Sequence, residues 1–211
     1  MYVPAAFEID DPVEIDSILA AYPFGILLTN DRDGLPFASH IPMLAQRREG
    51  ALVLLGHVAR ANPQSESIRR GEPALAIFSG PHAYISPNWY EPPYPQVPTW
   101  NYIAIHAGGH LREAPNPRSV LAKLTHTFEA RSPQPWQFEL LDDSYVERQI
   151  GGIVTFELAV ARIDGKAKLS QNRNERDRSG AIAGLAASEN LVDRACAEAM
   201  RHFATSAREM E

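Results

Sequence analysis

Short apolar runs separated by turn residues are the main pattern in the first part of the chain. Asp33-Gly34 stands between the first two runs, and Gly50 precedes the third. An Asp-Gly turn between apolar runs is typical of a β-hairpin. Closely spaced strands without helices between them favour an antiparallel sheet over parallel βαβ units. We therefore predict four strands, over residues 24–29, 36–44, 51–58 and 74–78.

Residues 81–98 break this pattern, because many prolines are interleaved with Tyr84, Trp89, Tyr90 and Tyr94. Proline has no amide hydrogen and is disfavoured in helix interiors and central strands. A disordered linker is seldom so aromatic. We therefore expect an ordered excursion that packs either on its own barrel or on a partner subunit.

The rest of the chain predicts two longer strands and three helices. Residues 100–111 and 153–163 alternate well enough for strands. Helix-capping residues precede apolar positions with three- and four-residue spacing in three places. The expected fold is α+β and mainly β, a barrel core with peripheral helices and a C-terminal helix. The helices are expected over residues 12–21, 117–131 and from 188 onward.

Composition and charge narrow the class of protein. The chain has 211 residues, of which 45% are hydrophobic, so it can bury a core. Its net charge of −6 and the lack of a helix-turn-helix pattern argue against a nucleic-acid binder, despite a local basic segment at 166–178. We see neither a membrane span nor a signal peptide, and Cys196 is the only cysteine. We therefore expect a cytoplasmic protein with a buried cysteine and no direct DNA or membrane contact.

Four polar clusters lie where predicted strands end, and polar groups there lose free energy unless they are paired. Each has an ordinary structural explanation, such as exposed strand positions, a helix cap at Asn62-Pro63 or a core anchor at Trp100. Four such clusters in one small barrel nevertheless favour a ligand site. The clusters are residues 39–42, 56–63, 97–102 and 165–172.

Other chemistries find little support. His106 and His110 are separated by Gly108 and Gly109, so we do not expect a helix to present both to a metal, and we predict no metal site. Neither a dinucleotide-binding glycine motif nor a phosphate-binding loop is present. Ser170 lacks the flanking glycines of a nucleophile elbow.

Longer motifs resemble the PaiB-type family of FMN-binding negative transcriptional regulators. The resemblance runs from the first residue to about Leu185. It departs from the family at Gln64, where an aromatic residue, usually Trp, is expected. The motifs are Met1-Tyr2-Val3-Pro4 with Phe7, Tyr22-Pro23-Phe24-Gly25, His40-Ile41-Pro42, and the stretches 56–63, 78–90, 97–102 and 166–172.

This resemblance implies a split β-barrel like that of pyridoxamine-phosphate oxidases. It implies a six-stranded antiparallel barrel over residues 1–185, with a C-terminal helix in residues 186–211 packed on the same domain. It also implies a homodimer that holds FMN at the subunit interface.

The resemblance also implies a set of flavin-binding residues. Arg60, Asn62 and Lys168 would face the phosphate, which favours charged hydrogen-bond donors. Trp100 would offer a stacking surface, and Asn101 would pair with the flavin ring. The full set is Ser39, His40, Pro42, His57, Arg60, Asn62, Trp100, Asn101, Lys168, Ser170 and Gln171.

Three functions remain open at this point. One is a flavin-dependent regulatory or sensing module, as the family implies. Another is an FMN-dependent oxidoreductase that uses a nicotinamide donor, and a third is a haem-binding variant. The sequence does not decide whether the protein is an enzyme, because a fold does not fix a function.

Overall fold

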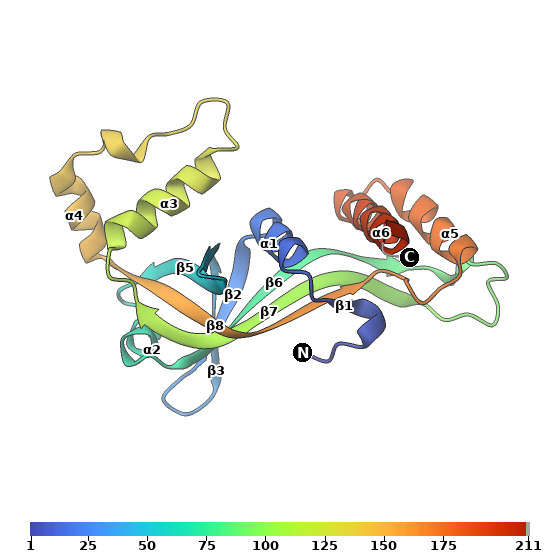
Figure 1. Cartoon of the computed structure of the whole chain (residues 1–211), viewed down its shortest axis with the longest axis horizontal. Coiled ribbons are helices and arrows are strands. Elements are labelled where there is room, and N and C mark those ends of the chain that lie inside the picture. Colours follow the sequence, from blue (N-terminus) through green and yellow to red (C-terminus); the bar gives the residue numbers. More distant parts are fainter. Residues whose placement is uncertain (210–211) are drawn as a thin grey trace. The chain divides into compact units, whose positions relative to one another are not determined.

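The computed structural model describes residues 1–209, and its main feature is one antiparallel sheet (Figure 1). The strand order is β3-β2-β6-β7-β8-β5-β4, and β1 pairs with β8. The strands are β1 (Glu8–Ile9), β2 (Phe24–Asn30), β3 (Pro36–Pro42), β4 (Leu44–Arg48), β5 (Ala51–Ala59), β6 (Pro73–Ile85), β7 (Thr99–Glu113) and β8 (Ile153–Lys168).

This sheet confirms the predicted split-barrel fold. The β2–β3 hairpin runs from the pair Phe24–Pro42 to the pair Asn30–Pro36. Gly34 occupies its turn with φ of +80°, a backbone angle that glycine adopts without a steric penalty. Over residues 1–209 the sheet has eight strands, whereas the resemblance implied six, because β1 and β4 are short additions.

Helices connect and flank these strands. The predicted first and third helices are confirmed, and Asn116 caps the second by accepting a hydrogen bond from the Ser119 amide at 3.0 Å. In the described residues no helix is long and apolar enough to cross a membrane. The α-helices are α1 (Pro12–Ala21), α2 (Gln64–Arg70), α3 (Pro117–Glu129), α4 (Asp143–Gly151), α5 (Glu175–Ala186) and α6 (Leu191–Glu209), and the short 3-10 turns are η1 (Ala5–Phe7), η2 (Pro87–Trp89) and η3 (Phe138–Leu140).

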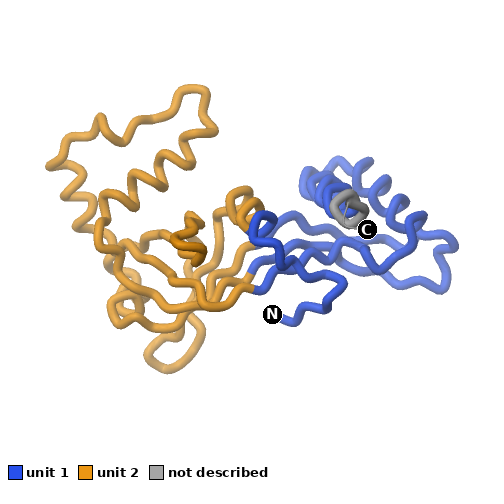
Figure 2. Tube along the Cα trace, in the orientation of Figure 1, with its two compact units in different colours: residues 1–15, 79–105, 164–211 blue, residues 16–78, 106–163 orange. Residues whose placement is uncertain are grey.

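The chain divides into two compact units, each containing part of β6, β7 and β8 (Figure 2). Unit 2 comprises residues 16–78 and 106–163. On one face of its β5, Val53 and Leu55 pack with Val120 and Leu124 of α3. The opposite face is so closely packed that a Cβ on Gly56 would lie 2.7 Å from the Phe156 ring.

Unit 1 comprises residues 1–15, 79–105 and 164–211, and the helices α5 and α6 pack together in it. Cys196 of α6 is fully buried, as predicted, and burial raises the pKa of its thiol to about 12. The thiol is therefore protonated at neutral pH and plays a packing role.

One predicted boundary was wrong, and two helices were not predicted. β6 continues through Pro81 to Ile85, so the aromatic excursion starts later than expected. Its pairing with β2 ends at Ile77, so Pro81 removes no donor from that ladder. The helices α4 and α5 were not predicted. The sequence of α5 has little apolar periodicity, and the helix packs so closely in unit 1 that a Cβ on Gly184 would overlap the Trp89 ring.

Candidate functional site

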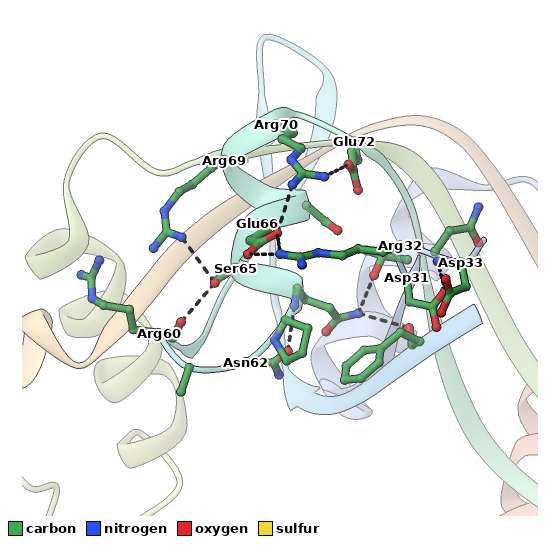
Figure 3. A pocket seen from close by; sticks show the side chains of 17 residues that line it. Asp31, Arg32, Asp33, Arg60, Asn62, Ser65, Glu66, Arg69, Arg70 and Glu72 are labelled. Atoms are coloured by element: carbon green, nitrogen blue, oxygen red, sulfur yellow. Dashed lines mark hydrogen bonds and ion pairs between the residues drawn. The ribbon is translucent and has the colours of Figure 1, made fainter. Parts of the chain in front are cut away.

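Unit 2 contains a cavity of about 600 Å³ between the β2–β3 turn and α2 (Figure 3). Its walls come from residues 29–33, Phe37, the loop 60–63 and α2 with Glu72. This volume is within the range of small-molecule and cofactor sites. The cavity is therefore the leading candidate for a ligand site in the described residues.

The loop after β5 shapes the cavity through Asn62. The Asn62 side-chain oxygen accepts a hydrogen bond from the Gln64 amide at 2.9 Å, which starts α2. The Asn62 side-chain nitrogen donates to the Ser39 hydroxyl at 2.9 Å. Two of the residues implied for flavin binding are thus brought together, and Asn62 also lines the cavity.

Gln64, where the resemblance led us to expect an aromatic residue, forms a polar and nearly fully buried wall of the cavity. Its side-chain nitrogen donates hydrogen bonds to the Leu27 carbonyl at 3.0 Å, the Thr29 hydroxyl at 3.2 Å and the Phe37 carbonyl at 3.3 Å. These acceptors fix the orientation of the amide. The opposite atom, Oε1, is buried without a hydrogen-bond partner among the described residues.

Two arginines of the cavity are neutralised by carboxylates. Arg32 of the β2–β3 turn donates two hydrogen bonds of 2.9 Å to Glu66. Arg70 also contacts Glu66 at 3.0 Å and Glu72 at 3.4 Å. The hydrogen bond from Arg32 lowers the pKa of Glu66, so this carboxylate is charged at neutral pH.

Arg60 and Arg69 differ from these two, because their partners within residues 1–209 are neutral oxygens. Arg60 donates to the carbonyls of Gly151 at 2.6 Å and Ile153 at 2.9 Å. Arg69 donates to the Ser65 hydroxyl at 3.4 Å. Figure 3 shows both on the side of Ser65 away from the β2–β3 turn. Neither guanidinium forms an ion pair with a carboxylate among the described side chains, although the charge of Arg69 contributes to lowering the pKa of Glu66.

The other implied residues of unit 2 do not line this cavity. The His40 ring lies 6.4 Å from that of Phe24, and Pro42 ends β3. His57 pairs with Thr155 across β5 and β8, and burial lowers its pKa. Its Nδ1 has no hydrogen-bond partner among the described residues.

Three of the implied residues of unit 1, Asn101, Lys168 and Ser170, line a second, smaller cavity of about 140 Å³. Asn101 and Ser170 are buried, line it and hydrogen bond to each other at 2.9 Å. Gln171 holds the turn after β8 by accepting from the Leu169 amide at 2.7 Å and donating to a backbone carbonyl. Lys168 lines this cavity as well, and the two cavities share no lining residue.

Trp100 lies outside both cavities. Its side chain is 55% exposed, and its ring centroid lies 6.2 Å from that of Tyr84 and 6.1 Å from that of His82. The exposed part of the aromatic excursion also includes Tyr94, whereas Tyr90 is buried within the chain. The structure thus leaves a stacking surface open in unit 1.

Sequence reasoning missed several polar residues of these cavities. Gln64 and Ser65 begin α2 directly after Asn62-Pro63, and Arg69 lies four residues after Ser65. The helix start at that dipeptide was a signal that Ser65 and Arg69 share one face of a helix. Arg173 lies just beyond the motif 166–172, in the basic segment noted in the sequence.

Solved structures with a similar fold include several flavoproteins. The FAD and heme binding protein of Mycobacterium smegmatis superposes with a TM-score of 0.60 at 17% identity, covering 82% of this chain and 79% of that protein. The flavocytochrome Anf3 of Azotobacter vinelandii gives 0.59 at 16% identity, with 82% and 75% covered. At these identities the likeness establishes the fold alone.

Sequence comparison gives a closer relationship. Residues 1–162 match the family described as "Putative FMN-binding domain". The protease synthase and sporulation protein PAI 2 of Bacillus subtilis (strain 168) is 34% identical over 202 residues, which cover 95% of this chain and 96% of that protein. These matches confirm the resemblance that the motifs indicated. The chain belongs to the PaiB-type family of FMN-binding domains.

Proposed function

We propose that the chain binds FMN and works as a cytoplasmic flavin-dependent regulatory or sensing protein. The observation that carries the proposal is the pair Arg60 and Arg69, which face the larger cavity without carboxylate partners in the described residues. Family membership supports flavin as the ligand. The Mycobacterium smegmatis and Azotobacter vinelandii proteins of similar fold are described as an FAD and heme binding protein and a flavocytochrome, which agrees with a flavin ligand.

The donor set of the cavity fits a phosphorylated flavin. A phosphate dianion is held best by charge-assisted hydrogen bonds, which Arg60 and Arg69 can supply. The Ser65 hydroxyl lies between them and Asn62 lines the same wall. The orphaned Oε1 of Gln64 is an acceptor that suits a hydroxyl or imide N–H of the flavin. When bound, FMN would supply redox chemistry or a redox-sensitive signal.

In a dimer, the remaining residues implied for flavin binding would complete the same FMN site. FMN would lie at the interface of two subunits, with Trp100 as the surface that stacks on the flavin ring and Asn101, Lys168, Ser170 and Gln171 supporting that region. The support is the exposed pair Tyr84 and Trp100. Ser39, His40, Pro42 and His57 would position the cavity from β3 and β5.

Regulation would act through a metabolite, a redox change or a protein partner. The Bacillus subtilis relative is named for protease synthesis and sporulation, which fits a regulatory role. The net charge of −6 opposes direct contact with DNA. An oxidoreductase function is not proposed, because no particular contact in residues 1–209 favours a nicotinamide donor.

Titration of the full-length protein with FMN tests this function. We expect flavin fluorescence to be quenched with one FMN per chain, and sedimentation to show a dimer. Under anaerobic conditions NADH and NADPH should leave the bound flavin oxidised. Absence of FMN binding by calorimetry would remove the proposed cofactor, and a monomer that binds FMN tightly would remove the interface model.

A further inference from the structure

The smaller cavity in unit 1 has the chemistry of an anion site of its own. Its floor is the buried pair Asn101 and Ser170, and its walls include Thr99, Lys168 and Arg173. We propose that this cavity binds the phosphate group of a small molecule other than the flavin. Asn101, Lys168 and Ser170 also belong to the region that would support Trp100 at the flavin, so the experiment below measures phosphate binding separately from FMN binding.

Both cations of the cavity are held in place by neutral groups. Lys168 donates to the Thr99 hydroxyl and to the Trp100 carbonyl, the latter at 2.9 Å. Arg173 donates to the side-chain oxygen of Gln96 at 2.8 Å, and its guanidinium lies 4.7 Å from the centre of the Tyr90 ring. Because these contacts fix the side chains before a ligand arrives, binding loses little additional conformational freedom.

None of the residues that line this cavity is a carboxylate, and Lys168 and Arg173 donate hydrogen bonds to neutral oxygens. Glu91 pairs with Arg176. Asp177 is buried in the first turn of α5, where its amide donates to the capping Asn174 side chain and its carboxylate accepts the Glu91 amide at 3.0 Å. Asp164 pairs with the N-terminal ammonium group. A partly buried cation normally faces a counter-charge, and an anionic ligand would supply it here.

The surroundings of Lys168 support this interpretation. Burial lowers the pKa of Lys168; Tyr102 acts in the opposite direction, and the positive charges of Lys166 and Arg173 lower the pKa further. An anion would relieve both effects, since it replaces lost hydration and balances the repulsion. Ser170 also has φ of +66°, a left-handed conformation that is rare outside glycine. Such backbone conformations are found preferentially at ligand sites.

The size of the cavity limits the ligand group. A volume of about 140 Å³ has room for one phosphate group but not for a whole flavin. Arg173 offers the planar fork that matches phosphate oxygens, and Lys168 adds a point charge. The rest of the small molecule would extend outward past the exposed residues Val97 and Pro98.

Calorimetric titration with inorganic phosphate tests the site in the full-length protein, both without flavin and after saturation with FMN. We expect phosphate to bind in both states. Lys168→Gln and Arg173→Gln should each weaken its binding about 10- to 100-fold, the usual effect of losing a charged hydrogen bond. Lys168→Arg should keep most of the affinity, because it keeps the charge and the donors.

Lys123→Gln is the matched control, since Lys123 is exposed on α3 in unit 2 and its removal changes the net charge equally. It should leave phosphate binding unchanged. The proposal is overturned if phosphate does not bind, if FMN saturation abolishes its binding, or if the two cavity variants behave like the control. A protein that fails to bind FMN but still binds phosphate would contradict only the proposed flavin function.

Discussion

The side chain of Asn62 donates a hydrogen bond to the Ser39 hydroxyl at 2.9 Å and so ties the loop after β5 to the middle of β3. The same Asn62 side chain accepts the Gln64 amide and starts α2. One residue therefore links a strand, a loop and a helix around the larger cavity. A small change at Asn62 should disturb all three.

Asn62→Ala should weaken FMN binding about tenfold, because the loop that carries Arg60 loses both anchors. Losing the hydrogen bond to the first amide of α2 should also lower the free energy of unfolding by about 1 kcal/mol. Ser39→Ala removes only the contact with β3, so its effect should be smaller. FMN titration and urea denaturation of both single variants and the double variant measure the coupling. Additive effects would show that the observed hydrogen bond does not shape the cavity.

Gln64→Leu should destabilise the protein, because the Leu27 and Phe37 carbonyls and the Thr29 hydroxyl lose their shared donor. A buried polar group without a partner costs about 1–3 kcal/mol. Urea denaturation measures the loss. Gln149→Ala, at an exposed position of α4, should change stability by less than about 0.5 kcal/mol. If the two variants are equally stable, Gln64 does not hold this wall.

His57 should make stability depend on pH. Burial lowers its pKa, so the folded state keeps the imidazole neutral where the unfolded chain, with a pKa of 6.5, already binds a proton. Above pH 6.5, His57 should not make the free energy of unfolding depend on pH. Below pH 6.5, the free energy of unfolding should decrease as the pH falls, by at most about 1.4 kcal/mol per pH unit.

Denaturation between pH 8 and pH 5 compares the wild type with His57→Gln, and His110→Gln serves as the control. We expect only His57→Gln to reduce the pH dependence. An unchanged pH profile in His57→Gln would mean that the imidazole is not held neutral by the fold.

Local patterns predicted most of the sheet, because each signal acts within a few residues. The Asp33-Gly34 turn and the apolar runs beside it predict the β2–β3 hairpin, and Asn116-Pro117 predicts the start of α3. The extent of β6 beyond Pro81 was not predictable in this way. Whether a proline interrupts a strand depends on which neighbour is paired at that point, and the β2 ladder ends at Ile77.

The candidate site was predicted only in part, since charges depend on distant partners. The sequence indicates that Asn62 and Ser39 belong to one site, and the structure brings them together. It does not distinguish Arg69 from Arg70. Arg70 is neutralised by Glu66 and Glu72, whereas Arg69 contacts a hydroxyl, and this difference follows from how α2 is oriented in the fold.

The most direct test of the proposed FMN phosphate site in the larger cavity compares Arg69→Gln with Arg70→Gln in titrations with FMN and with riboflavin. The two variants lose the same charge from neighbouring positions of α2. We expect Arg69→Gln to weaken FMN about 10- to 100-fold and riboflavin hardly at all, because riboflavin has no phosphate. Arg70→Gln should leave both affinities within about threefold. Equal losses of FMN affinity in both variants, or equal losses of FMN and riboflavin in Arg69→Gln, would contradict a phosphate held by Arg69.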